Sequence, residues 1–491
     1  MRTKLAFVGI DIGTQGVRAA ALLENGELCS GQSYPFAKQD AELMRREQNP
    51  ELWWQAAVLC LRKVAADIRK RSDPVRIHGI TVSSTSGTVI PLGKGFAPLH
   101  PALMYGDTRS AEAAEWCSRI AGQSGEAGAR FTSSYGLPKI VWFQRTNPHL
   151  AEKVQLWAHA ADFIVGRLSG AWGVTDHTNG FKTGYLLEQE KWPDYISRGL
   201  GIPEHALPKV APTGTIVGRV SLQASELTGL PVSAHVTTGV TDSCASQISS
   251  GAIKPGDWNT TIGTTLVLKG VTKSPVADRQ HRIYNHKHPE GYWMPGGASN
   301  TGADWVALDY SDEELDRFNR AAAGLIPTPW AAYPLKQTGE RFPFVAPGAR
   351  GFEPAGLTPS QTFAARMEGT AYIERLSYSL IERLSGERAS RIYTAGGASN
   401  SATWLRIRSH VAGVPIVKMK HASGAAGAAI LAASKTYFAN LTEAGERMLV
   451  PEARYEPESA SLRERYEQLY AAFVEQLEAR GYMKDWEEGK N

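Results

Sequence analysis

The stretch LAFVGIDIGTQGVRAAALL, residues 5–23, decides the fold, because it is typical of two buried strands joined by a polar turn. Asp11 interrupts the first apolar run. A buried, unpaired carboxylate costs several kcal/mol, so we expect a cation or a ligand beside it. The turn GTQG, residues 13–16, can direct backbone N–H groups toward an anion. By itself the stretch equally fits a plain hairpin, since neither common glycine-rich nucleotide fingerprint is present.

Length and composition narrow the class of protein. A chain of 491 residues exceeds what one core supports, so we expect two or three domains. A formal net charge of +4 over this length gives no reason to expect a nucleic-acid partner. The four cysteines form no C-x-x-C pair, which favours reduced thiols. The apolar run Leu5–Ile10 is too short for a secretion signal and no later run approaches a membrane span, so we expect a cytoplasmic protein.

The order of patterns along the chain predicts an α/β protein with an internal repeat. A helical pattern at 50–70 precedes a buried strand at 76–82, and a second buried strand at 235–240 leads to Thr241-Asp242-Ser243. DWNTTIGTTLVLKGVT, residues 257–272, is again strand, turn and strand, and its Ile-Gly-Thr repeats that of the first hairpin about half the chain later. So short a repeat can arise by chance, but two lobes, each with one phosphate-binding hairpin and with nucleotide in the cleft between them, would explain both the repeat and the length.

A third glycine-rich segment lies in RIYTAGGASN, residues 391–400. Paired glycines between a strand and a helix allow backbone to approach a ligand closely, although for this segment alone a tight turn without a ligand is the better explanation. GGASN also occurs at 296–300, without the strand and helix context, and has no assigned role. We expect helices at 424–435, packed closely on a sheet, and at 459–481, packed on the core. His281, His286 and His288 are more typical of a solvated face than of a metal site.

Taken in order, these segments resemble the FGGY family of carbohydrate kinases over nearly the whole chain. The motifs that carry the resemblance are DIGTQGVR (11–18), YGDTR (105–109), GVTDS (239–243), IGTT (262–265), GERFP (339–343) and AGGASN (395–400). The resemblance implies the actin-like ATPase fold, in which two ribonuclease-H-like lobes, residues 1–251 and 252–491, surround a nucleotide and sugar cleft.

The resemblance also implies site residues. Asp242 matches the catalytic base, although from the residues alone it could equally be a helix N-cap. Asp11 and Asp242 would hold Mg²⁺. Asp107 and Arg109 match the sugar-side motif, and their alternative is a surface ion pair. The residues expected to bind ATP are Asp11, Gly13, Thr14, Gln15, Gly263, Thr264, Thr265, Gly396, Gly397, Ala398 and Asn400. Those expected to bind the sugar are Ser86, Asp107, Arg109 and Asp242.

The resemblance therefore predicts an ATP-dependent kinase for the terminal hydroxyl of a ketopentose, D-ribulose or D-xylulose. Xylulose kinases usually carry a Gly-Gln-Met-His-Gly type turn where this chain has SSTSGT, residues 83–88, and this difference favours D-ribulose modestly. The alternative for that turn is that it only caps the following segment. The alternatives for function are a kinase for glycerol, a hexulose or another polyol, and a non-enzymatic actin-like nucleotide switch. We expect ATP, Mg²⁺ and a sugar as partners, no nucleic acid and no membrane, and leave homodimer formation open.

Overall fold

A computed structural model describes residues 2–37, 41–126, 129–484 and 486. Contacts between residues divide the chain into two compact units. The first unit consists of residues 1–249, 286–291 and 423–449, and the second of 250–285, 292–422 and 450–491. The expected division after residue 251 lies two residues past the first boundary, and the two later segments that return to the first unit were not foreseen.

The first unit is built on a mixed parallel and antiparallel sheet that contains the opening hairpin. Its strands are β1 (Lys4–Gly13), β2 (Gly16–Leu23), β3 (Leu28–Pro35), β5 (Val75–Ser84), β11 (Ile216–Arg219), β12 (His235–Thr237) and β13 (Val240–Thr241). The strand order is β11-β12-β5-β1-β2-β3, with β13 also on β5. β1 and β2 are antiparallel, as the opening stretch predicts, while β1, β12 and β13 all run parallel to β5.

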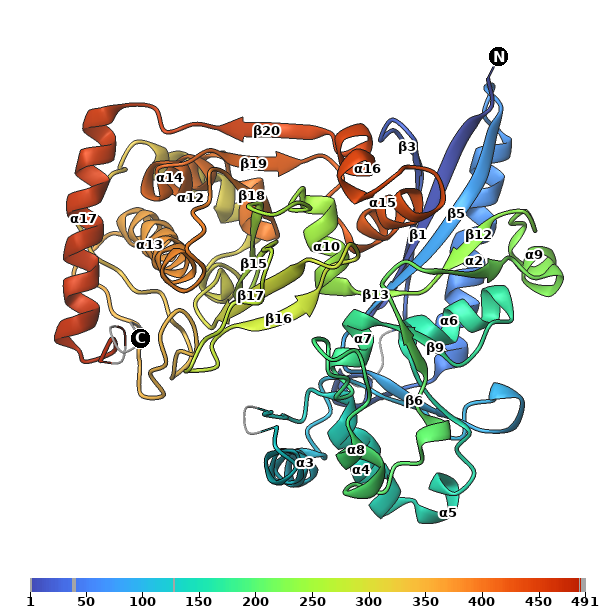
Figure 1. Cartoon of the computed structure of the whole chain (residues 1–491). Coiled ribbons are helices and arrows are strands. Elements are labelled where there is room, and N and C mark those ends of the chain that lie inside the picture. The colour runs from blue at the N-terminus through green and yellow to red at the C-terminus, as the bar shows by residue number, and fades with distance from the viewer. Residues whose placement is uncertain (1, 38–40, 127–128, 485, 487–491) are drawn as a thin grey trace. The chain divides into compact units, whose positions relative to one another are not determined.

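Two helices cover the sheet of the first unit (Figure 1). The predicted helix at 50–70 is α2 (Pro50–Arg69), which begins after its N-cap Asn49, and the one at 424–435 is α15 (Gly424–Thr436). Successive side chains of β1 point to opposite faces. The even-numbered Val8 and Ile10 share a core with α2, whereas a Cβ at Gly9 would lie 1.8 Å from the Ala425 carbonyl oxygen of α15.

The rest of the first unit surrounds a small antiparallel sheet of order β4-β7-β6-β8 and a two-stranded pair of β9 with β10. These elements are α1 (Ala41–Arg46), β4 (Glu47–Gln48), β6 (Val89–Leu92), η1 (Lys94–Phe96), β7 (Ala102–Leu103), α3 (Ala111–Gln123), α4 (Gly136–Thr146), α5 (Pro148–Ala151), β8 (Leu156–His159), α6 (Ala160–Ser169), β9 (Val174–Asp176), α7 (His177–Phe181), α8 (Asp194–Arg198), η2 (Glu204–Ala206), β10 (Lys209–Ala211), α9 (Leu222–Thr228), α10 (Asp242–Ser250) and α16 (Leu441–Met448).

The second unit is also α/β, with strand order β16-β17-β15-β14-β18-β19-β20. The strands are β14 (Trp258–Ile262), β15 (Leu266–Gly270), β16 (Tyr284–Lys287), β17 (Trp293–Ser299), β18 (Ile392–Ala395), β19 (Ile416–Met419) and β20 (Pro451–Tyr455). The helices are α11 (Asp304–Asp309), α12 (Asp312–Ala323), α13 (Pro359–Ser385), η3 (Gly397–Asn400), α14 (Ala402–Ala412) and α17 (Ala460–Ala479). α17 is the predicted C-terminal helix, and it buries Tyr466, Phe473 and Leu477. Figure 1 shows β19 and β20 side by side, as their antiparallel pairing requires.

The two units repeat one topology. In the first, the hairpin β1-β2 adds β3 on one side and the parallel strands β5 and β12 on the other. In the second, the hairpin β14-β15 adds β17 on one side and the parallel strands β18 and β19 on the other. The repeated Ile-Gly-Thr therefore occupies the same place in each sheet. In the part of the chain that the structure describes, no helix has the length and apolar character that a membrane span needs.

Candidate active site

Three parallel strands of the first unit end at the same edge of the sheet. In register, Asp11 of β1 lies opposite Ser83 of β5, and Ser83 lies opposite Val240 of β13. Ser86 follows the end of β5, and Asp242 follows the end of β13. Ligands of α/β sheets bind at the carboxyl ends of the strands. The structure thus brings three predicted site residues, Asp11, Ser86 and Asp242, to one such edge.

Asp11 is buried and has protein partners on both sides. Ser83 Oγ donates a hydrogen bond of 2.9 Å to Oδ1, and Arg18 Nη1 lies 3.7 Å from Oδ2. A Cβ at Gly424, the first residue of α15, would come within 2.7 Å of Oδ1. Burial raises the pKa of Asp11, against the lowering effects of the Ser83 bond and the Arg18 charge. Arg18, the cross-strand partner of Asp11, is thus a cation of the protein itself that sequence reasoning missed, and the magnesium ion expected at Asp11 stays a prediction.

The first hairpin turns tightly beside Asp11. Gly13 and Gly16 are paired, so Thr14 and Gln15 form the turn. Gln15 is exposed and Thr14 is half-buried. A Cβ at Gly16 would lie 2.5 Å from the Tyr34 carbonyl oxygen, which explains why glycine occupies this position. This arrangement leaves the backbone of the turn accessible to an anion.

Asp242 is the first residue of α10 and is half-buried. Its Oδ1 accepts a 2.7 Å hydrogen bond from the N–H of Ser243. The preceding Thr241 is fixed by a 2.9 Å bond from its N–H to Thr178 Oγ1 of α7. A carboxylate at the start of a helix both satisfies a terminal N–H and benefits from the helix dipole, so a role at the helix end is compatible with catalysis.

Ser86 lies in a turn whose shape is fixed by its neighbours. Thr85 Oγ1 and Thr88 Oγ1 are 2.9 Å apart, and Thr88 Oγ1 also accepts a 3.3 Å bond from the N–H of Tyr105. Gly87 has φ +79°, and a Cβ there would lie 2.2 Å from the Ser134 carbonyl oxygen. The Ser86 hydroxyl is buried and has no hydrogen-bond partner among the described residues. Because such a group is costly when unpaired, it indicates a polar ligand.

Asp107 and Arg109 form an ion pair whose carboxylate is buried. Asp107 is 1% exposed, and Arg109 donates to it from Nε at 3.0 Å and from Nη2 at 2.7 Å. Arg109 Nη2 also lies 2.5 Å from Glu47 Oε1, and the guanidinium stacks over the Trp142 ring at 4.5 Å. The bond to Asp107 is the main cause of the raised pKa of Arg109. The YGDTR motif therefore contains a buried, ion-paired carboxylate rather than a pair lying wholly on the surface.

A buried lysine lies close to this motif. Lys139 of α4 is fully buried and donates to the carbonyl oxygens of Ser133 and, at 3.3 Å, Tyr135. Burial lowers the pKa of Lys139 to about 7, although the charge of Asp107 acts to raise it.

This pKa predicts a pH-dependent stability. Between about 7 and the ordinary value of 10.5, Lys139 binds a proton in the unfolded chain but not in the folded one. Stability therefore rises with pH in this window, by up to about 1.4 kcal/mol per pH unit. Urea unfolding of the native protein and Lys139→Met at pH 7, 8 and 9 measures this contribution. We expect the native protein to gain stability relative to the variant as pH rises, and a constant difference would contradict the assignment.

In the second unit, the second hairpin occupies the position equivalent to the first. Its turn consists of Gly263, Thr264 and Thr265, and Thr264 is exposed. Gly263 N–H donates to the Thr265 carbonyl oxygen at 3.0 Å, and the Gly263 carbonyl oxygen accepts from Ala303 N–H at 2.7 Å. One hydrogen bond within the turn and one from Ala303 thus fix its backbone.

The segment that holds this turn includes the first GGASN, at 296–300. The buried carboxylate of Glu340 accepts bonds from Ser299 Oγ (2.8 Å), Asn300 N–H (2.7 Å) and Thr301 Oγ1 (2.8 Å). Glu340 belongs to the GERFP motif. The first GGASN also pairs with the second hairpin, since Ser299 of β17 lies opposite Leu266 of β15, a contact that sequence reasoning did not foresee.

The second GGASN forms a turn after β18. Gly396 has φ +86°, and a Cβ there would lie 2.4 Å from the Ile262 carbonyl oxygen, so only glycine fits. Gly396 and Asn400 line a pocket of about 360 Å³ together with Lys418 and Lys420. Lys418 Nζ lies 3.4 Å from Asn400 Oδ1.

Of the four residues predicted to bind adenosine, Gly397 and Ala398 are not among the described residues that line this pocket. Gly397 is exposed and Ala398 is buried. The two lysines were missed by sequence reasoning. Lys418 lies on β19 opposite Thr394 of β18, and no motif in the sequence marks it.

The carboxylates of the first unit fit a magnesium ion. No group of three or more His, Cys, Asp or Glu side chains suited to a metal occurs among the described residues. Mg²⁺ does not require one, because it keeps several waters and binds one or two carboxylates together with substrate phosphates. Asp11 and Asp242, at one sheet edge, supply that number of carboxylates.

The repeated hairpin sheets and the site at their strand ends define the class of protein as a two-domain α/β sugar kinase of actin-like fold. Residues 6–249 match the N-terminal domain of the FGGY family of carbohydrate kinases, and residues 258–436 match its C-terminal domain. The chain belongs to this family and is a phosphotransferase that uses ATP. Family membership confirms the predicted fold and enzyme class, and it excludes the alternative of a non-enzymatic nucleotide switch.

Similar proteins act on different sugars. The chain is 26% identical to the gluconokinase of Bacillus subtilis (strain 168), over 95% of this chain and 94% of the relative. It is 24% identical to the xylulose kinase of the same organism, over 94% of this chain and 95% of the relative. The crystal structure of xylulose kinase from Rhodospirillum rubrum superimposes with a TM-score of 0.84 at 22% identity, covering 96% of this chain and 98% of that one. At these identities the fold is shared and the sugar is not determined.

Proposed function

We propose that this kinase transfers the γ-phosphoryl group of ATP to the terminal hydroxyl of a ketopentose, with D-ribulose modestly favoured over D-xylulose. The observation that carries the proposal is the buried Ser86 hydroxyl, which lacks a partner among the described residues and lies at the sheet edge that also carries Asp11 and Asp242. The turn at 83–88 contains only Ser, Thr and Gly, so its longest polar side chains are hydroxyls rather than an imidazole. A hydroxyl reaches less far and pairs with a different sugar oxygen.

In this proposal Asp242 accepts the proton of the attacking sugar hydroxyl, and Asp107 and Arg109 orient the sugar. Phosphoryl transfer passes through a loose transition state, so alignment and charge neutralisation supply most of the catalysis. Mg²⁺ held by Asp11 and Asp242 would neutralise charge on the phosphates. The N–H groups of Gly13, Thr14 and Gln15 would bind phosphate oxygens.

In the second unit, Gly263, Thr264 and Thr265 would contact phosphate, and the 360 Å³ pocket beside Gly396 and Asn400 would take the adenosine. The exposed glycine backbone at 396–397 permits the close approach that a flat base or ribose needs. Ala398, being buried, would support this turn from beneath.

The substrate is tested by measuring kcat/KM for D-ribulose, D-xylulose, gluconate and glycerol with saturating Mg·ATP. An unpaired hydroxyl in a desolvated site costs about 1 to 3 kcal/mol, so we expect D-ribulose to be preferred over D-xylulose by about tenfold. A tenfold preference for D-xylulose would overturn the ribulose assignment, and turnover only on glycerol or a hexose derivative would overturn the ketopentose assignment.

Gluconate is the second candidate, because a gluconokinase is among the relatives that match nearly the full length of the chain. Its carboxylate would need a cation, and Arg18, with a side chain 56% exposed beside Asp11, is one such group. Activity on gluconate that falls at least tenfold in Arg18→Gln, with ATP binding retained, would support this candidate over the ketopentose.

A further inference from the structure

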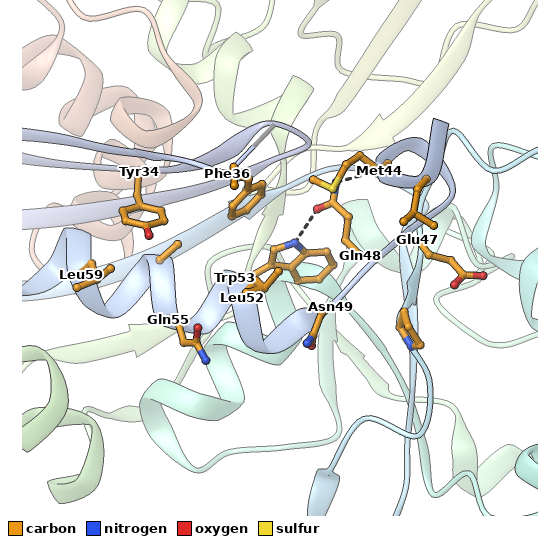
Figure 2. A pocket seen from close by; sticks show the side chains of 14 residues that line it. Tyr34, Phe36, Met44, Glu47, Gln48, Asn49, Leu52, Trp53, Gln55 and Leu59 are labelled. Carbon is orange, nitrogen blue, oxygen red and sulfur yellow. Dashed lines mark hydrogen bonds between the residues drawn. The ribbon is translucent and has the colours of Figure 1, made fainter. Parts of the chain in front are cut away.

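Gln48 connects the phosphate-binding turn of the first unit to a buried tryptophan. It is the second residue of β4, which pairs with Ala102–Leu103 of β7, and it is 5% exposed. Its Nε2 donates to the carbonyl oxygens of Thr14 and Met44, both at 3.0 Å. Its Oε1 accepts a 2.8 Å bond from Trp53 Nε1 of α2, which Figure 2 shows. No role in the reaction follows for Gln48 from the motifs described above.

The hydrogen-bond partners fix the orientation of the Gln48 amide. An indole N–H can only donate, so the amide oxygen must face Trp53. The two carbonyl oxygens can only accept, so the NH₂ group must face Thr14 and Met44. If the amide were reversed, its NH₂ would face the Trp53 N–H and its oxygen would face the carbonyl oxygens of Thr14 and Met44. Trp53 therefore determines that Gln48 presents a donor to the turn.

Holding one carbonyl of the turn determines the direction of the next N–H. A trans peptide unit is planar, and its C=O and N–H point in opposite directions. Because the Thr14 carbonyl oxygen points to Gln48, the N–H of Gln15 points away from it. The next carbonyl oxygen, that of Gln15, is held by the N–H of Phe36 at 2.9 Å. Both peptide units of the turn are thus anchored through their oxygens, and each N–H points away from the group that holds its own carbonyl.

We propose that Gln48 is a positioning residue that aims the Gln15 N–H at a phosphate oxygen of ATP. This inference rests on the proposed role of the first hairpin as a phosphate site. Gln48 itself does not touch the nucleotide; it acts through the Thr14–Gln15 peptide. Preorganised backbone donors bind an anion without the cost of ordering them, so loss of Gln48 weakens nucleotide binding and transition-state stabilisation.

The preceding residue, Glu47, provides a comparison because its side chain bonds a different part of the unit. Glu47 Oε1 lies 2.5 Å from Arg109 Nη2 of the YGDTR motif, whereas Gln48 Nε2 bonds the Thr14 carbonyl oxygen of the first hairpin turn. Both also line the pocket of about 400 Å³ beside α2, as does Gln55. Substitution of Gln48 should therefore change KM for ATP, and substitution of Glu47 should change KM for the sugar.

The test compares Gln48→Met, which keeps the length but removes the amide donors and the acceptor for Trp53, with Gln48→Glu, which keeps an acceptor for Trp53 but puts another against the Thr14 carbonyl. In Gln48→Met we expect KM for ATP and the calorimetric Kd of Mg·ATP to rise about tenfold, the effect of losing the one buried hydrogen bond to the Thr14 carbonyl oxygen. In Gln48→Glu both values should rise further. KM for the sugar should stay within about twofold. Glu47→Gln should show the reverse pattern, and Gln55→Ala should resemble the native protein.

Thermal unfolding without nucleotide separates positioning from simple loss of structure. A folded Gln48→Met with unchanged Kd for Mg·ATP overturns the inference, and so do equal rises in both KM values. If Gln48→Met does not fold, Gln48→Glu, which is nearly isosteric, decides by the same readouts. If the native protein phosphorylates none of the sugars, the proposed substrate fails, but the calorimetric comparison still tests Gln48.

Discussion

Asp242→Asn is expected to lower kcat for sugar phosphorylation by at least about a hundredfold while leaving the Kd of Mg·ATP within a few-fold. The asparagine amide has nearly the shape of the carboxylate and can still accept the bond from the Ser243 N–H, so the start of α10 should be preserved. It cannot accept the proton of the sugar hydroxyl. Steady-state kinetics with the best sugar, together with calorimetric titration of Mg·ATP, measure the two quantities separately.

A matched control uses Asp194, which is also the first residue of a short helix, α8, and is exposed. Asp194→Asn removes the same charge from a helix start and should leave kcat unchanged. Near-normal turnover in Asp242→Asn would reject Asp242 as the base. Loss of activity together with loss of Mg·ATP binding would instead indicate that Asp242 acts mainly through the metal.

The parts of the fold that could be predicted from the sequence are those set by local pattern. Alternating or continuous apolar runs around a short polar turn specify a hairpin, and the stretches at 5–23 and 257–272 both form one. The helices at 50–70 and 424–435 have boundaries within a residue of those expected. The order of these elements was sufficient to predict two similar α/β lobes.

The parts that could not be predicted depend on contacts between distant segments. Residues 423–449 return to the first unit because small side chains let α15 pack on β1, where Gly9 leaves room for the Ala425 carbonyl. Nothing local in either segment specifies that partner. The same limit applies to Gln48, since its bond to Thr14 requires β4, β7 and the hairpin to be placed first.

The sequence allowed a prediction of candidate site residues where a residue type is unusual in its setting and has few possible explanations. A carboxylate within a buried strand, as at Asp11, demands a partner and so attracts attention. Arg18 and Lys418 were missed because an arginine or lysine is common on any surface, and only the register of neighbouring strands shows what each one faces. Side-chain partners on adjacent strands therefore carry information that linear motifs lack.

Removing Glu374 should destabilise the second unit by about 3 to 5 kcal/mol, because it leaves a guanidinium buried without a counter-charge. Arg408 of α14 is fully buried and donates to Glu374 of α13 at 2.7 and 2.8 Å. Its Nη1 also donates to Thr394 Oγ1 of β18 at 2.7 Å, and this hydroxyl in turn bonds the Thr260 carbonyl oxygen of β14 at 3.2 Å. The cluster thus joins two helices to the strands that end at the second hairpin and at Gly396. Urea unfolding of Glu374→Ala measures the loss.

Two further variants show whether charge burial is the cause. Replacing Glu374 and Arg408 together by methionine removes both charges and keeps most of the volume, so this double variant should be less destabilised than Glu374→Ala. Glu456→Ala breaks the exposed ion pair with Arg454 in the same unit and should cost less than about 1 kcal/mol. If Glu374→Ala costs no more than this exposed pair, or if the double variant is the less stable, the buried guanidinium is not the source of the effect. A positive result would also predict weaker ATP binding in Glu374→Ala below its unfolding transition, since β14 and β18 carry the turns proposed to contact the nucleotide.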